Sequence, residues 1–220
     1  TMSSNHRVQD FQEPALLIAD GEKCSQKLVD ELLAWGPFVL MLDGAVRFSS
    51  AYKIFPDAVL GDFDDHFDAK KFVNPEHTKI IEAPNQNKTD LEKGLDYLIS
   101  LGIHSVNIIW ANGQRTDHVL NNYSSYIKYK KDIQIAIIDD YCKSYFLPNE
   151  FKKYYPKGSK ISLIPAWQAK QVCTSGLKYD LDDAHLELGQ KTSSSNESAK
   201  DGFVQISFSE GNILLIECQD

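Results

Sequence analysis

The stretch "VNIIWANGQRTDHVLNNYSSYIKYKKDIQIAII", residues 106–138, decides the fold class of this chain. Its apolar runs at 106–110 and 133–138 have the length of strands, and residues 114–130 between them have helical spacing. A strand, a helix and a second strand in this order predict a parallel sheet with helices on its faces.

The same pattern extends toward the N-terminus. Residues 23–35 and 88–102 have helical spacing, and they alternate with short apolar runs at 15–19, 38–42, 57–61 and 78–82. We therefore predict a Rossmann-like α/β nucleotide-binding domain over residues 1–147.

The pattern changes after residue 147, because no helical period follows. Strand-like runs occur at 159–167, 171–181, 184–189, 203–209 and 212–218. They predict an all-β, sandwich-like domain over residues 148–220. The tetrapeptide "SEGN" (209–212) predicts a hairpin turn, and the polar tract 189–202 predicts a long loop.

Bulk composition narrows the function classes. The net charge of -8 over 220 residues argues against a protein that coats nucleic acid or an anionic membrane. No apolar stretch reaches the ~20 residues of a membrane span and no secretion signal is evident, so we expect a soluble, cytoplasmic protein. The four cysteines are scattered without a CxxC pair, which predicts reduced, buried thiols.

Acidic residues concentrate after the predicted strands. Asp43 follows the second strand, "GDFDD" (61–65) follows the third, and "NQNKTD" (85–90) follows the fourth. Gathered carboxylates repel one another, so this edge of the sheet suits a cation such as Mg²⁺. The alternative is structural: Asp65 would begin a helix, and Thr89 with Glu92 has the spacing of a capping box.

The segment "GQRTDHV" (113–119) carries a cation at an unusual place. If a helix begins near Gln114, Arg115 lies in its first turn, where the macrodipole opposes a positive charge. A bound phosphate would explain an arginine there. The alternative is a solvated Arg115 paired with Asp117.

The order of six motifs is more specific than any one of them. They are DGA (43–45), GDFD (61–64), NQNKTD (85–90), GQRTDH (113–118), GLKYDL (176–181) and SSSNES (193–198). This series resembles the thiamin pyrophosphokinases. The resemblance implies a homodimer with the active site near the subunit interface, which converts ATP and thiamin to AMP and thiamin diphosphate.

The resemblance also implies roles for individual residues. It assigns Mg²⁺ to Asp62, Asp64 and Asp90, with Asp43 close by, and it assigns the thiamin to Gln86, Ser195 and Asn196. The expected nucleotide contacts are Gly44, Thr89, Gly113, Arg115 and Asp117. The expected catalytic residues are Asp43, Asp62, Asp64, Asp90, Arg115 and Asp117, with Asp43 or Asp117 as the group that orients or deprotonates the alcohol.

Three residues depart from the family pattern: Ala45 replaces a glycine, Asn87 an aspartate, and Tyr179 a tryptophan. Tyr179 leaves open which aromatic side chain supports the thiamin rings.

Two other functions stay open at this point. One is a diphosphokinase for another primary alcohol such as a hydroxymethyl pterin, and the other is a nucleotide-sensing binding protein without turnover.

Overall fold

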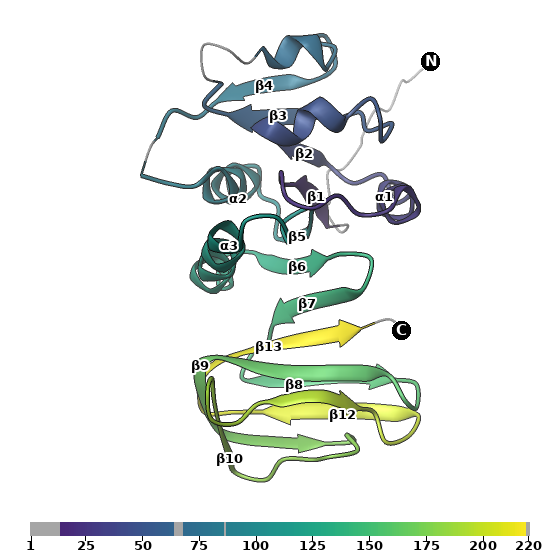
Figure 1. Cartoon of the computed structure of the whole chain (residues 1–220), viewed down its shortest axis with the longest axis vertical. Helices are drawn as coiled ribbons and strands as arrows, with labels where there is room; N and C mark the ends of the chain where they lie inside the picture. Colours follow the sequence, from purple (N-terminus) through teal and green to yellow (C-terminus); the bar gives the residue numbers. More distant parts are fainter. Residues whose placement is uncertain (1–13, 64–67, 86, 219–220) are drawn as a thin grey trace, which may run out of the picture.

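The structure is a computed structural model that describes residues 14–63, 68–85 and 87–218. Within these residues, one half of the molecule holds three α-helices. The other half is built from strands, as Figure 1 shows. The first half comprises β1 (Ala15–Ile18), α1 (Gln26–Leu33), β2 (Val39–Leu42), η1 (Asp43–Phe48), β3 (Ala58–Gly61), η2 (Ala69–Lys71), β4 (Lys79–Glu82), α2 (Asp90–Ser100), β5 (Ser105–Ile109), α3 (Thr116–Tyr129) and β6 (Gln134–Ile138).

Strands β1 to β6 form a parallel sheet in the order β4-β3-β2-β1-β5-β6. Successive residues of a strand point to opposite faces, so each strand contributes to two cores. Leu17 and Leu40 pack with α2 and α3 on one face, whereas Leu16 and Met41 pack with Val29 of α1 on the other. The predicted Rossmann-like half is confirmed.

The strand order places one topological switch point in this sheet. The chain runs outward from β1 through β2 and β3 to β4, and then returns to place β5 on the other side of β1. The loops that leave β1 and β5 therefore diverge to opposite sides and open a crevice at the carboxyl ends of these strands.

The second half is antiparallel and continues the same sheet. It comprises β7 (Cys142–Phe146), β8 (Glu150–Tyr155), β9 (Lys160–Ser175), β10 (Ala184–Glu187), β11 (Ser193–Glu197), β12 (Gly202–Ser207) and β13 (Glu210–Cys218). Strand β7 pairs with β6 and with β13, and β13 pairs with β9. The predicted β-rich half is thus confirmed, while the domain boundary between residues 147 and 148 stays a prediction.

Three details of the β-rich half differ from the sequence prediction. The runs 159–167 and 171–181 were expected as separate strands, but β9 is continuous through Ser175. It pairs with several strands along its length: β13 and β11 pair with its first part, and β12 and β10 pair with its later part. A strand that changes partners in this way shows no break in sequence that would reveal the change.

The predicted hairpin at 209–212 is wrong, because β12 and β13 do not pair with each other. Strand β12 lies between β8 and β9, whereas β13 lies between β7 and β9. The predicted loop at 189–202 contains strand β11, in which Ser193 and Asn196 are buried. Turn residues and polar composition do not predict these pairings, because the partners of a strand are set by the rest of the sheet.

The four cysteines are free, as predicted, although only Cys24 is buried and the other three are half-buried. In the described part of the chain, no helix is long and apolar enough to cross a membrane.

Candidate active site

A cavity of about 670 Å³ occupies the switch point of the parallel sheet. Its walls come from the loops after β1, β2, β3 and β5 and from the first turns of α2 and α3. The lining residues with ionisable or amide side chains are Asp20, Asp43, Arg47, Asp62, Lys88, Asp90, Lys93, Gln114, Arg115, His118, Asn121 and Asn122.

Three half-buried carboxylates, those of Asp43, Asp62 and Asp90, line this cavity. Burial raises the pKa of Asp43, and the negative charges of Asp62 and Asp90 raise it further. The Oδ1 atom of Asp43 is buried without a hydrogen-bond partner. A buried carboxylate oxygen without a partner, in the field of two other carboxylates, favours a bound cation, and oxygen ligands of this kind suit Mg²⁺.

A buried lysine lies beside this acidic group. The Lys93 side chain is 7% exposed, and its Nζ donates to Asp90 Oδ1 at 3.1 Å. Lysine is almost never buried unless it is paired, so the carboxylates set the position of this residue. Lys93 is not among the site residues predicted from the sequence, although its place three residues after Asp90, one turn along a helix, is a local signal for it.

Close backbone approaches shape the same cavity. A Cβ atom at Gly44 would collide with Oδ2 of Asp20, so the loops after β1 and β2 touch at this point. Gly113 has a φ of +74°, and a Cβ atom there would lie 2.6 Å from Cβ of Glu22. Glycine is thus required at Gly113, which adopts the left-handed conformation, whereas a side chain at Gly44 would displace the Asp20 carboxylate.

Thr89 caps helix α2 and also lines the cavity. Its Oγ1 accepts a hydrogen bond from the backbone N–H of Glu92 at 3.2 Å, and Glu92 accepts one from the N–H of Thr89 at 3.4 Å. This reciprocal pair is the capping box that the sequence offered as the structural alternative. The cap places Asp90 in the first turn of the helix, at the edge of the cavity.

Arg115 and Asp117 form a two-pronged ion pair. Arg115 donates from Nε to Oδ1 of Asp117 at 3.1 Å and from Nη2 to Oδ2 at 2.5 Å. Arg115 precedes helix α3 at its N-cap, so the helix begins at Thr116, after the predicted start near Gln114. The hydrogen bond from Arg115 lowers the pKa of Asp117 to about 2, and Asp117 is absent from the cavity lining, whereas Arg115 belongs to it.

Asp64, Gln86 and the predicted helix start at Asp65 lie outside the described residues. Within residues 14–63, 68–85 and 87–218, no three His, Cys, Asp or Glu side chains lie close enough together to form a metal site by themselves.

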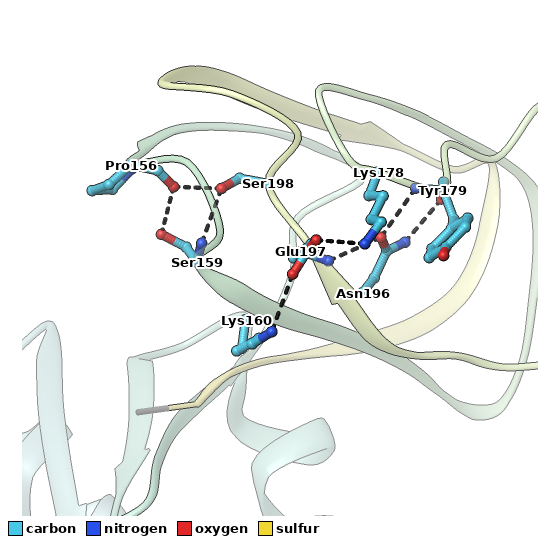
Figure 2. A network of polar contacts seen from close by, with 8 residues as sticks. All are labelled: Pro156, Ser159, Lys160, Lys178, Tyr179, Asn196, Glu197 and Ser198. Atoms are coloured by element: carbon cyan, nitrogen blue, oxygen red, sulfur yellow. Dashed lines mark hydrogen bonds and ion pairs between the residues drawn. The ribbon is translucent and has the colours of Figure 1, made fainter. Parts of the chain in front are cut away.

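Ser195 and Asn196 lie on β11 in the β-rich half, away from the lining of this cavity. Asn196 is 2% exposed, and its amide accepts from Tyr179 N at 3.2 Å and donates to Tyr179 O at 2.8 Å. Figure 2 shows this clasp beside Glu197, which is held between Lys160 and Lys178. Asn196 thereby fixes the backbone of Tyr179, whose side chain is 65% exposed.

Several cavity residues beyond Lys93 were also missed, among them Asp20, Arg47 and Trp110. Asp20 follows the first predicted strand, so its position at the same edge of the sheet is a signal that could have identified it. Nothing in the local sequence distinguishes Arg47 or Trp110 from ordinary residues of a helix or a strand end.

A parallel sheet with a carboxylate-lined cavity at its switch point, extended by an antiparallel half, defines a two-part α/β protein that suits a phosphorylated ligand with a cation. Residues 29–137 match the family model of the thiamin pyrophosphokinase catalytic domain, and residues 149–213 match that of the thiamin pyrophosphokinase vitamin B1 binding domain. The chain belongs to the thiamin pyrophosphokinase family.

Individual relatives agree with this assignment. Thiamine pyrophosphokinase 1 of Arabidopsis thaliana is 29% identical over 194 residues, which cover 82% of this chain and 69% of the relative. The Bacillus subtilis enzyme is 27% identical over 173 residues, which cover 76% of this chain and 80% of the relative.

Solved structures of the family share the fold. The thiamine pyrophosphokinase of Bacillus subtilis superposes with a TM-score of 0.78 at 23% identity, and the match covers 94% of this chain and all of that one. The yeast thiamin pyrophosphokinase superposes with a TM-score of 0.80 at 14% identity, covering 96% and 88% of the two chains.

Proposed function

We propose that this protein transfers the diphosphate of ATP to the hydroxyethyl oxygen of thiamin and releases AMP. The observation that carries the proposal is the gathering of Asp43, Asp62 and Asp90 with Arg115 in one cavity. Carboxylates recruit a cation to the phosphates, and a guanidinium adds a second positive group at the start of a helix.

The metal in this proposal is Mg²⁺, held by Asp62, Asp64 and Asp90. The unpartnered Oδ1 of Asp43 and the raised pKa of this residue support a cation at this place. When bound, Mg²⁺ would neutralise part of the negative charge of the triphosphate.

The reaction joins the alcohol oxygen of thiamin to the β-phosphorus of ATP and breaks the bond between that phosphorus and the oxygen bridging to the α-phosphate. The alcohol loses its proton, and AMP leaves with the bridging oxygen. Residues of the chain align the two substrates and offset the charge on the phosphate oxygens, a task that we assign to Arg115 together with Lys93.

Between the two candidates for the group that receives or orients the alcohol proton, the geometry favours Asp43. Its pKa is raised and it lines the cavity. Asp117 is a poor base, because its ion pair with Arg115 holds its pKa at about 2. We keep Asp117 in the proposal as the residue that orients Arg115 toward the nucleotide. Gly44, Thr89 and Gly113 remain proposed nucleotide contacts.

Thiamin needs a second set of contacts. Ser195 and Asn196 do not line the cavity of their own chain, which supports a homodimer in which the β-rich half of one subunit approaches the cavity of the other. Gln86 and Ser195 remain our assignments for direct contact with thiamin. Asn196 acts on the thiamin site through the backbone of Tyr179, to which its amide is hydrogen-bonded. Sedimentation of the purified protein at micromolar concentration tests this arrangement, since a fully active monomer would contradict it.

The decisive assay measures AMP released from ATP with and without thiamin, in the presence of Mg²⁺. We expect AMP only when thiamin is present. Release of ADP would contradict diphosphate transfer, and AMP formation with a hydroxymethyl pterin in place of thiamin would favour the alternative substrate. Binding of ATP without any turnover would support a nucleotide sensor.

A further inference from the structure

A second cavity, of about 660 Å³, lies apart from the active site. It is bounded by the amino ends of β5 and β6, the end of helix α3, and the connection from β7 to β8. The active-site cavity lies beyond the carboxyl ends of β1 and β5 and shares no lining residue with it. Figure 1 shows where α3, β6 and β7 meet, between the two halves of the molecule.

The charge of this second cavity is opposite to that of the protein. Its lining contains Lys130, Lys131 and Lys143 and, among the described residues, no Asp or Glu, although the chain has a net charge of -8. None of the three lysines forms an ion pair with a described carboxylate. The Nζ of Lys130 donates to the neutral Oδ1 of Asn212 at 2.5 Å.

Lys130 is a cation that is partly removed from water and has no carboxylate partner among the described residues. It is half-buried, and burial lowers its pKa, with a further contribution from the positive charge of Lys131. A cation that loses water without gaining a carboxylate is stabilised by an anion that enters the cavity. Lys131 and Lys143 are exposed, so their ammonium groups are available at the entrance.

Four aromatic residues are part of the cavity lining. Tyr145 and Phe151 pack with ring centroids 6.1 Å apart, and Tyr126 and Phe146 complete the aromatic part of the wall. Tyr126 is 1% exposed, and its hydroxyl has no hydrogen-bond partner. Burial raises the pKa of Tyr126, so this hydroxyl stays a neutral donor without an acceptor.

We propose that this cavity binds a small aromatic anion, with its ring against Tyr145 and Phe151 and its negative group among the lysines. The volume lies within the range of about 300–1,000 Å³ that small-molecule sites occupy. A planar ring suits the aromatic side chains of Tyr145 and Phe151, and an anion supplies the partner that the three lysines lack. The site is separate from the transfer of diphosphate and does not depend on it.

The test uses 2-naphthoate as the probe and 2-naphthamide, its uncharged analogue, as the matched ligand, both measured by titration calorimetry on the full chain. We expect the naphthoate to bind at least about tenfold more tightly than the amide, since hydrogen bonds to an ionised group are the stronger ones. Hydrogen exchange on the naphthoate complex should show protection at 130–136 and 143–149.

Lysine variants test where the carboxylate of the probe binds. Lys131→Gln combined with Lys143→Gln should weaken naphthoate binding about tenfold and leave naphthamide binding unchanged. The matched control is Lys152→Gln on β8, an exposed lysine outside the cavity lining, which should leave both ligands unaffected. Because Lys131, Lys143 and Lys152 are all exposed, the variants should fold, and their circular dichroism spectra will verify this.

Three results would overturn the proposal. The first is naphthoate binding no tighter than that of the amide, or no binding of either ligand. The second is an equal loss of affinity in the double variant and in the Lys152 control. The third is protection confined to residues 111–122, which would place the probe in the active-site cavity.

Discussion

Replacing Asn196 with alanine distinguishes a residue that supports the β-rich half from one that touches thiamin. The buried amide takes part in four hydrogen bonds, with Tyr179 N, Tyr179 O, Glu197 N and Ser193 Oγ, at distances between 2.8 and 3.3 Å. At about 1 kcal/mol for each of the three partners on the backbone, Asn196→Ala should lower the free energy of unfolding by about 3 kcal/mol.

The assay is urea unfolding followed by circular dichroism, combined with the KM for thiamin. Ser195→Ala is the matched control, because the Ser195 side chain is exposed and should change stability by less than about 0.5 kcal/mol. The structure also predicts that Asn196→Ala raises the KM for thiamin only through the released backbone of Tyr179. A loss of less than about 1 kcal/mol together with a large rise in KM would refute this reasoning and show a direct contact.

Further predictions concern the two cavities. Asp62→Asn should reduce turnover by at least about a hundredfold at unchanged urea stability, since it removes charge from the proposed metal site; normal activity in the AMP assay would contradict the metal assignment. Asp43→Asn should stabilise the metal-free protein at pH 7. The reason is that a raised carboxyl pKa in the folded state makes ionisation destabilising, and this penalty disappears as the pH falls toward the ordinary value of 3.8. Unfolding measured in EDTA between pH 4 and 7 tests the sign of this effect. A stability gain of Asp43→Asn that grows toward low pH would contradict the prediction. Tyr126→Phe removes a buried hydroxyl without a partner, so the free energy of unfolding should stay constant or rise by up to about 1 kcal/mol, and a clear fall would indicate a partner for that hydroxyl.

The parallel half of the fold was predictable because its signals are local. Each strand from β1 to β6 is an apolar run close to its predicted bounds, and each helix has a regular apolar stripe. The edge of the sheet that carries Asp43, Asp62 and Asp90 followed from the rule that ligands lie beyond the carboxyl ends of parallel strands.

The β-rich half was predictable in class but not in pairing. Nothing in residues 209–212 reveals that β12 and β13 are not paired with each other, because each strand pairs with a different part of β9. Lys93 was missed for a related reason. Its spacing of three residues from Asp90 indicates an ion pair on one helix face, but a helix sequence does not reveal that the cavity wall covers this pair.

The pairing of β7 with β13 has a consequence for how the chain folds during synthesis. Strand β7 (residues 142–146) pairs with β6 on one side, and its partner on the other side lies at 210–218, so this second edge of β7 stays open until the intervening segment has been made. An open strand edge is a template for association with other chains. Slowing translation between residues 147 and 209 should therefore increase aggregation, and a chaperone that shields strand edges should have its largest effect during this interval.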